Sequence, residues 1–210
     1  MTSAATPHTT SADLLVLHAL RCAGFSGPAR LAEVTGLTAE DVESELIDLA
    51  VDGLVTRTPG EFEGWGLSEA GRGAGAERIA AELDATGTRP TAERAHEGFM
   101  ELNPELLDLC TAWQLRPVDG VRTLNDHTDP GYDARVLDLF TDLDQRLEAV
   151  CADLSANLVR FRRYRVRLSG ALGRARSGAL EEVADGTSSY HAVWAQLHED
   201  LLATLGVPRY

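Results

Sequence analysis

Lysine is absent from this chain of 210 residues, so all 19 of its positive charges are arginines. They are outnumbered by 33 aspartates and glutamates, which leaves a formal net charge of -14. Averaged over its surface, such a protein repels nucleic acids and anionic membranes. A partner of either kind must therefore be met through a local cluster of arginines.

Cysteines are few, and long apolar runs do not occur. Cys22, Cys110 and Cys151 lie far apart without a C-x-x-C pair, which excludes a disulfide framework and a zinc knuckle. The chain starts without a basic, apolar leader, and nowhere do 18 apolar residues follow one another. We therefore expect a cytoplasmic protein with no export signal and no membrane partner.

Catalytic motifs are missing as well. The patterns G-x-S-x-G and H-E-x-x-H and the phosphate-binding P-loop are not found. The stretch GRGAG at 71–75 imitates a glycine-rich loop, but no βαβ unit surrounds it. The sequence thus predicts a protein that is not an enzyme, with no cofactor, no catalytic residue and no metal site.

Helical periodicity dominates what is present. With 44% hydrophobic residues, the chain can form one large or two small cores. We predict a mainly α fold with a disordered lead at 1–12, one domain at 13–86 and a helical dimerisation or ligand-binding domain at 87–210.

The N-terminal domain shows a clear order of elements. Apolar spacing predicts helices at 13–23, from Pro28 to Gly36, and from Thr38 to about Asp52, with Thr38 as the N-cap. Two short strand-like runs follow around a Pro-Gly turn. Three helices and a two-stranded wing make a winged helix-turn-helix.

This stretch resembles the MarR-like transcription regulators over residues 13–85. The segment ARLAEVTGLTAEDVESELIDLAVDGLVTR has the layout of that family, and GLSEAGR at 66–72 is similar to its exit from the wing into the next helix. The resemblance implies a winged-helix fold and regulation of transcription.

The C-terminal part is predicted to be an antiparallel helical bundle. Helices are expected at 69–85, 91–115 and 187–205, with a long polar connection at 116–131. One helix of roughly 36 residues, at 133–168, should carry a coiled-coil-like seam. The seam positions are Val136, Phe140, Leu143, Leu147, Val150, Leu154, Asn157, Phe161, Tyr164 and Leu168. This seam either packs within the chain or forms a homodimer.

The third helix is acidic where a DNA-reading helix carries cations. Between Pro28 and Arg72, three arginines face ten acidic residues, a local charge of -7. DNA binding through this helix is therefore disfavoured, because phosphates and base edges are contacted largely by Arg, Lys, Asn and Gln. Glu61 and Glu63 place more acid at the wing. Glu40, Glu43 and Asp48 are instead candidate contacts for a basic protein partner.

Arginines gather at 160–176, where seven occur without an acid. A solvated helix face is the plainest explanation. Helical spacing also places Arg160, Arg163 and Arg167 on one face, and these three, with Arg57 of the wing, are candidate contacts for nucleic acid or another anion. Arg165 lies beside the seam, where partial burial demands a carboxylate of the same fold, an anionic ligand or nucleic acid.

A ligand pocket is predicted where residues of the C-terminal domain could converge. Its members are Trp113, Arg116, His127, Arg165, Tyr190 and His191. The segment NDHTDPGYD around His127 could supply oxygen ligands to a metal, although turn and cap chemistry accounts for it equally. His191 and His198 are seven residues apart, too far along a helix to share one metal easily.

A second resemblance covers about half of the chain. The stretches LCTAWQLRP, NDHTDPGYDARVL and SYHAVWAQLHEDLLATLG are similar to a helical segment of actinobacterial proteins, some of them phosphoenolpyruvate-utilising or regulatory. It assigns no role to any residue.

The sequence leaves three functions open: a ligand-responsive transcription regulator, a winged-helix module that binds a partner protein, and a helical protein that binds a small molecule or metal. An enzyme built around His127 and His191 has the least support.

Overall fold

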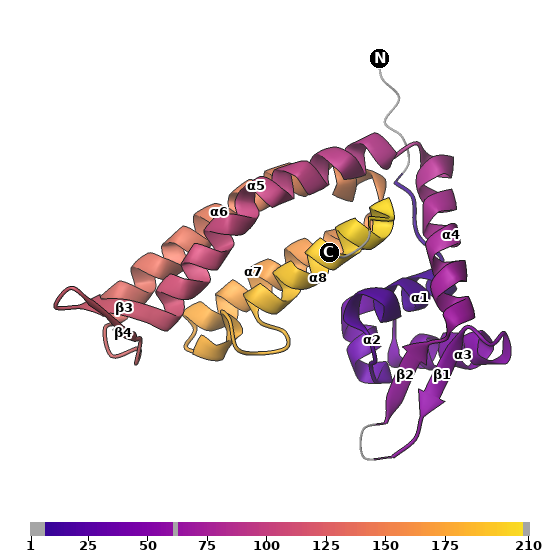
Figure 1. The fold of residues 1–210 in the computed structure, drawn as a ribbon, viewed down its shortest axis with the longest axis horizontal. Helices are drawn as coiled ribbons and strands as arrows, with labels where there is room; N and C mark the ends of the chain where they lie inside the picture. Colours follow the sequence, from indigo (N-terminus) through magenta and orange to yellow (C-terminus); the bar gives the residue numbers. More distant parts are fainter. Residues whose placement is uncertain (1–6, 61–62, 208–210) are drawn as a thin grey trace. The chain divides into compact units, whose positions relative to one another are not determined.

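The computed structural model describes residues 7–60 and 63–207, and these are mainly helical, as predicted (Figure 1). The helices are α1 (Ala12–Ala23), α2 (Pro28–Thr35), α3 (Ala39–Val51), α4 (Glu69–Thr86), α5 (Arg89–Gln114), α6 (Pro130–Asn157), α7 (Arg162–Arg176) and α8 (Tyr190–Leu205). Two antiparallel hairpins pair β1 (Val55–Thr58) with β2 (Gly64–Leu67) and β3 (Leu115–Val118) with β4 (Val121–Leu124).

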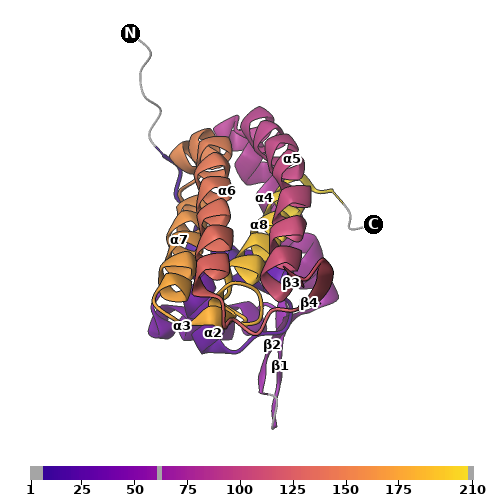
Figure 2. The ribbon, with the colours of Figure 1, turned by 90° about the vertical axis from the view of Figure 1, so that its left-hand side faces the viewer.

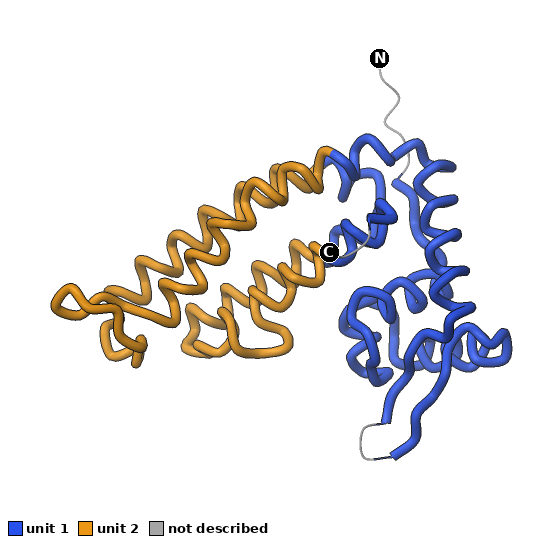
Figure 3. Tube along the Cα trace, in the orientation of Figure 1, with its two compact units in different colours: residues 1–93, 153–163, 199–210 blue, residues 94–152, 164–198 orange. Residues whose placement is uncertain are grey.

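The chain divides into two compact units, neither of which is continuous in sequence (Figure 3). Unit 1 comprises residues 1–93, 153–163 and 199–210, and unit 2 comprises 94–152 and 164–198. Helices α5 to α8 each contribute residues to both units. This division differs from the predicted domains at 13–86 and 87–210, because two C-terminal segments belong to unit 1.

Helices α1, α2 and α3 enclose the apolar core of unit 1 together with the first hairpin. Core residues such as Leu17, Leu31 and Leu46 are at most 1% exposed. The predicted cap of α3 is confirmed: Thr38 Oγ1 accepts a hydrogen bond from the Asp41 backbone N–H at 3.1 Å. Such a cap satisfies one of the backbone donors that the first turn of a helix leaves unpaired.

The hairpin β1–β2 leads directly into α4. Its register pairs Val55 with Leu67, and Ser26 extends it through a bridge to Trp65. At the first turn of α4, a Cβ atom on Gly71 would lie only 1.9 Å from the Leu54 carbonyl oxygen. Gly71 therefore permits this close approach of helix and hairpin, and the GRGAG stretch lies within α4.

The expectation of a disordered lead at 1–12 is wrong for its second half. Residues 1–6 lie outside the described residues, but His8 forms a parallel bridge with Leu158, donating its backbone N–H to Asn157 and accepting from Val159. Thr10 is 4% exposed, and its hydroxyl donates to Glu82 at 2.6 Å. Backbone pairing and a buried side chain thus hold this segment in place.

The predicted long polar connection at 116–131 is also wrong, because residues 115–124 form the hairpin β3–β4. Asp119 and Gly120 at its turn have φ values of 50° and 81°. Two consecutive positive φ angles belong to the two-residue turn for which Asp-Gly is a strong signal. The sequence Val118–Val121 therefore contained the hairpin signal, between strands too polar to be recognised.

The single helix predicted at 133–168 is interrupted. Helix α6 ends at Asn157, a 3-10 turn covers Val159–Phe161, and α7 starts at Arg162. Pairing of His8 with the backbone around Leu158 accompanies the break. Eight of the ten seam positions are nevertheless buried within the single chain, with Val150 and Asn157 only partly covered.

Within unit 2, the helices pack along one another. Helices α5 and α6 lie side by side (Figures 1 and 2), and a Cβ atom on Gly98 would lie 3.0 Å from the Val150 side chain. The Phe140 ring meets the Tyr190 ring edge-on at 5.4 Å. Among the residues that the structure describes, none of the helices combines the length and apolarity that a membrane span requires.

Candidate functional site

The exposed face of α3 combines carboxylates with apolar side chains. The three predicted partner contacts, Glu40, Glu43 and Asp48, are all exposed. Between them, Ile47 is 53% exposed and Val51 83% exposed. These two are four residues apart and are therefore neighbours on the helix surface. Helix α3 thus presents an apolar strip flanked by negative charge, without an arginine in its sequence.

Acidic residues on α3 also influence one another. Partial burial of Glu45 and the nearby carboxylates of Asp13, Asp48 and Asp41 raise the pKa of Glu45 above its ordinary value. Burial is the larger cause, and the three carboxylates add negative potential around Glu45. A cation brought to this surface would relieve it.

Arg57, the predicted anion contact of the hairpin, is already paired. Its Nε donates to Glu63 at 2.9 Å, and its guanidinium lies 5.9 Å from the centre of the Trp65 ring. Hydrogen bonding to Glu63 raises the pKa of Arg57. Glu61, the other acid predicted at the wing, lies outside the described residues.

Arg160 is not a surface residue, and its predicted contact with nucleic acid is wrong. Its side chain is completely buried and donates to Glu82 at 3.2 Å and to the Thr204 hydroxyl at 2.8 Å. Arg160 lies in the 3-10 turn after α6, where Glu82, Asp200 and Thr204 enclose its side chain.

Arg163 and Arg167 are likewise engaged with groups of the protein itself. Arg163 donates to the Asp200 carboxylate at 2.9 Å, and Arg167 donates to the Gln196 side-chain oxygen at 2.7 Å. Both residues are partly buried. The structure therefore does not assemble the three predicted arginines into one exposed basic patch.

Arg165 has found a carboxylate of the same fold, one of the three partners considered for it. It forms ion pairs with Asp144 and with Glu148, the latter at 3.1 Å. The Tyr190 hydroxyl donates to Asp144 at 3.4 Å. Burial raises the pKa of Asp144, against the opposing effect of Arg165. These contacts form a structural ion pair between α6 and α7.

The loop around His127 is held by turn chemistry. His127 has a φ of 57°, and its Nδ1 lies 3.0 Å from Asp133, which also accepts from Asn125 at 2.8 Å. The His127 ring packs 4.7 Å from that of Trp113. These contacts agree with the turn and cap chemistry that was set beside metal binding for this loop. In the part of the chain that the structure describes, the loop holds no group of three donors close enough to share a metal.

The contacts of the six predicted pocket residues fall into separate groups. Arg116 donates to Asp126 at 2.8 Å beside the Trp113 and His127 pair, and His191 donates its backbone N–H to the Val183 carbonyl. A cavity of about 530 Å³ lies instead in unit 1, at the C-terminal ends of α1 and α8. Its walls include Leu20, Arg21, Phe25, Leu67, Arg72 and Leu202, none of which the sequence singled out as pocket residues.

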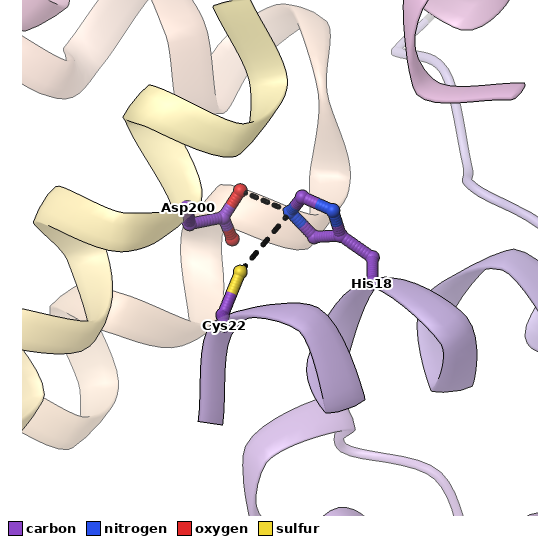
Figure 4. A group of neighbouring side chains, drawn as sticks. All are labelled: His18, Cys22 and Asp200. Carbon is purple, nitrogen blue, oxygen red and sulfur yellow. Dashed lines mark hydrogen bonds and ion pairs between the residues drawn. The ribbon is translucent and has the colours of Figure 1, made fainter. Parts of the chain in front are cut away.

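A cluster that the sequence did not reveal lies inside unit 1. His18 and Cys22 of α1 point toward Asp200 of α8 (Figure 4). His18 Nε2 is 2.6 Å from Asp200 Oδ1 and 3.6 Å from Cys22 Sγ. His18 and Asp200 have side chains 1% and 0% exposed. These three residues are called the α1–α8 cluster below.

The buried Arg160, the partly buried Arg163 and a second carboxylate surround the α1–α8 cluster. Asp200 Oδ2 accepts from Arg163, and Oδ1 accepts from the Thr204 hydroxyl at 3.0 Å. Arg160 Nε lies 3.9 Å from Asp200 Oδ1, while its other nitrogen donates to Glu82. Two guanidinium groups thus meet two buried carboxylates, and the interior is close to neutral.

No family model, curated protein or solved structure matches this chain. The chemistry of the α1–α8 cluster therefore follows from its own geometry. Asp200 and Cys22 both approach the same nitrogen of His18. In a nucleophilic triad, the histidine contacts the acid through one ring nitrogen and the nucleophile through the other. This arrangement cannot relay a proton in that way.

The charges of the α1–α8 cluster also disfavour a reactive thiol. Burial raises the pKa of Cys22 well above its ordinary value, and Asp200 adds to the effect. Burial lowers the pKa of His18. Burial alone would raise the pKa of Asp200, but contacts with His18, Arg160 and Arg163 hold it well below the ordinary value. At neutral pH these pKa changes leave a thiol, a neutral imidazole and a carboxylate in the cluster.

One signal for this cluster was present in the sequence. His18 and Cys22 are four residues apart on a helix, the spacing at which two side chains become neighbours. Their third member, Asp200, is 182 residues from His18. No local pattern relates positions so distant, because their proximity arises only when α8 packs within unit 1.

Proposed function

We propose that residues 12–86 form a winged helix and that the exposed face of α3 binds a basic protein partner. The order of three helices and an antiparallel hairpin, followed by α4, supports the winged helix. Residues 94–152 and 164–198 form a second, helical unit. In this proposal the protein is a cytoplasmic adaptor without catalytic activity.

The observation that carries the proposal is the mixed character of the α3 face. Ile47 and Val51 are exposed between the carboxylates of Glu40, Glu43 and Asp48. Protein interfaces combine an apolar centre with a polar rim, and complementary charge steers the partner. A basic partner with an apolar anchor fits both features of the surface.

The distribution of arginines supports a protein partner over DNA. The cations nearest to a DNA-binding role are bonded within the chain: Arg57 to Glu63, Arg160 to Glu82 and Arg163 to Asp200. DNA binding draws much of its affinity from cations that displace counterions at phosphates. An arginine that is ion-paired with a carboxylate of its own chain contributes little to the release of counterions from DNA.

The test selects partners from a displayed library of random peptides, using the whole protein as bait. Selected peptides should be rich in Arg or Lys with at least one large apolar residue. Replacing Glu40→Arg together with Glu43→Arg should weaken their binding at least about tenfold, or about 1.4 kcal/mol. Ile47→Ser should also weaken it, because the apolar anchor loses its contact.

Glu97→Arg together with Glu101→Arg is the matched control. These exposed glutamates lie on α5 and give the same change in net charge. The control should bind the selected peptides as the original protein does. Equal losses in both double variants would mean that overall charge, not the α3 face, determines binding, and would refute the proposal.

Regulation of transcription through duplex DNA is the second candidate, favoured by the helix and hairpin order of unit 1. A salt titration on labelled duplex DNA from the promoter region of the gene distinguishes it. Tight, salt-sensitive and promoter-selective binding would replace the protein-partner proposal. Absence of binding at low salt, where electrostatic attraction is strongest, would leave α3 as a protein-facing surface.

A further inference from the structure

We propose that His18, Cys22 and Asp200 form a binding site for one Zn²⁺ ion. This site is separate from the α3 face, and the inference does not depend on the proposed function. Among the described residues, these three are the one group of His, Cys, Asp or Glu side chains whose donor atoms all lie within 4.8 Å of one another. They offer an imidazole nitrogen, a sulfur and a carboxylate oxygen.

The spacing of the donor atoms suits a tetrahedral ion. Zinc binds nitrogen, oxygen and sulfur at about 2.0–2.3 Å, which places its ligand atoms roughly 3.3–3.7 Å from one another. The distance from His18 Nε2 to Cys22 Sγ is 3.6 Å, already within this range. The distance from His18 Nε2 to Asp200 Oδ1 is 2.6 Å, because the two atoms are hydrogen-bonded. A metal would separate that pair by less than about 1 Å.

The backbone holds two of the ligands in position. His18 and Cys22 are four residues apart within α1, so one turn of a well-formed helix fixes their separation. His18 is 1% exposed and Asp200 is fully buried, which restricts their rotamers. Sites of this kind lose little side-chain freedom when the metal binds.

The surroundings of Asp200 orient its carboxylate as an outer coordination sphere does. Arg163 binds Oδ2, which leaves Oδ1 directed toward His18 and Cys22. The Thr204 hydroxyl contacts Oδ1 as well. Hydrogen bonds to a ligating carboxylate commonly fix its direction and tune the metal. The two guanidinium groups are themselves balanced by Glu82 and Asp200.

The tautomer of His18 is free to change. Within the described residues, Nδ1 of His18 is buried and has no hydrogen-bond partner. No contact on that side therefore fixes which nitrogen carries the proton. The proton lies on Nε2 when this atom donates to Asp200, and it moves to Nδ1 when Nε2 gives its lone pair to the metal.

Binding of the ion releases one proton from the site. The Cys22 S–H bond breaks, its proton passes to solvent, and a bond from Sγ to Zn²⁺ forms. His18 contributes a lone pair from Nε2, and Asp200 contributes one from Oδ1. The Cys22 thiolate and the Asp200 carboxylate bring two negative charges to the ion. Counted together with Arg160, Arg163 and Glu82, the occupied site carries one net positive charge. A thiolate and an imidazole select zinc over magnesium or calcium, which prefer oxygen.

The experiment titrates the whole, metal-free protein with Co²⁺, a spectroscopic probe for zinc sites. We expect one equivalent to bind, with the intense visible bands of a tetrahedral ion and a near-ultraviolet band from thiolate to cobalt. Added Zn²⁺ should remove both. Cys22→Ala should abolish the thiolate band and weaken Zn²⁺ binding beyond the roughly 10–100-fold loss caused by removing an outer-sphere partner.

Cys151→Ala is the matched control, since Cys151 also lies on a helix but belongs to unit 2. It should keep the band, the stoichiometry and the zinc-dependent rise in Tm of the original protein. Circular dichroism of the metal-free variants checks that both are folded, and Cys22→Ser replaces Cys22→Ala if the latter is not. No stoichiometric binding, or the same thiolate band in Cys22→Ala, would overturn the proposal.

Discussion

Asp200 neutralises buried positive charge in the interior of unit 1. It is fully buried, accepts from Arg163 at 2.9 Å and lies 3.9 Å from Arg160 Nε. Without the charge of Asp200, Arg160 would keep Glu82 as a carboxylate partner, and Arg163 would lose its ion pair with Asp200. We expect Asp200→Asn to lower the free energy of unfolding by about 3–5 kcal/mol, the usual cost of leaving a buried charge without its partner. Urea unfolding at neutral pH measures it.

An exposed aspartate supplies the comparison for Asp200. Asp48→Asn on α3 removes the same charge from the surface, and its effect should stay within about 0.5 kcal/mol. Similar losses of unfolding free energy in the two variants would mean that Asp200 acts through overall charge and not through its ion pairs with Arg160 and Arg163.

His18 should make the free energy of unfolding depend on pH in a range above that in which carboxylates titrate. Burial lowers its pKa in the folded protein. The unfolded chain therefore takes up a proton near the ordinary pKa of about 6.5, while the folded protein does not. Stability from this residue is complete above that pH and falls as the pH decreases toward the folded value. The urea midpoint, measured with a chelator at pH 7 and pH 5, should drop less for His18→Gln.

His191→Gln is the control for this measurement, because His191 lies on α8 outside the network. It should retain the full decrease between pH 7 and pH 5. Asp200 contributes in the same direction at lower pH: its depressed pKa means that its stabilisation persists above the ordinary value of about 3.9 and is lost below it. A steep decrease that survives in His18→Gln would contradict the assignment to His18.

At the scale of elements, the N-terminal segment acts as part of unit 1. His8 shares two backbone hydrogen bonds with Asn157 and Val159, and Thr10 reaches the buried Glu82. Deleting residues 1–10 should lower the free energy of unfolding by about 2–4 kcal/mol, since each lost hydrogen bond contributes about 1 kcal/mol and Glu82 loses a partner. Thermal unfolding followed by circular dichroism tests it.

Deleting residues 1–6 alone leaves these contacts in place and should change Tm little. If both deletions had the same small effect, the segment would be the disordered lead that its small, polar composition suggests. Composition describes the average behaviour of such residues. Here the backbone hydrogen bonds of His8 with Asn157 and Val159 hold the segment in an ordered position despite its composition.

Local patterns predicted some elements and missed others for physical reasons. Apolar spacing and end signals such as Pro28, Gly36 and Thr38 identified the helices of unit 1 closely. The break at Leu158 was invisible because the seam positions on both sides remain buried. The heptad pattern reports burial, and a 3-10 turn between two helices preserves burial while interrupting the helix.

The same limit applies to the candidate sites. The acidic face of α3 could be predicted, since neighbours on a helix are neighbours in sequence. The α1–α8 cluster could not, because its members come from both ends of the chain. Arg160 was misplaced because the residues that enclose its side chain, Glu82 and Thr204, are distant from it in sequence.

At the scale of the whole molecule, the buried seam bears on assembly. The sequence predicted a homodimer partly because a long seam needs a partner, yet Leu147 is 2% exposed within one chain. We expect Leu147→Ala to cost about 2–5 kcal/mol by opening a cavity. If the seam packs within the chain, this loss is the same at low and high protein concentration. A loss that depends on concentration would place the seam in a dimer interface, because dimer stability follows mass action.

The dimer itself stays a prediction. Apolar side chains exposed in unit 2, such as Leu124 at 81% and Val166 at 72%, are the remaining surfaces of that kind. Sedimentation of the original protein and of Leu124→Ser and Val166→Ser variants decides whether either contributes.

The discontinuity of unit 1 has a consequence for the time course of synthesis. A ribosome adding about 5–20 residues per second needs roughly 10–40 s to pass from His18 to Asp200, 182 residues later. Once residue 86 has been added, α1 to α4 are complete, but His18 has no Asp200 carboxylate to contact until α8 is made. A nascent chain stopped before residue 199 contains every residue of the proposed winged helix and still lacks a part of unit 1. Its final packing therefore follows translation, and newly made chains should be most sensitive to proteolysis just before α8 emerges.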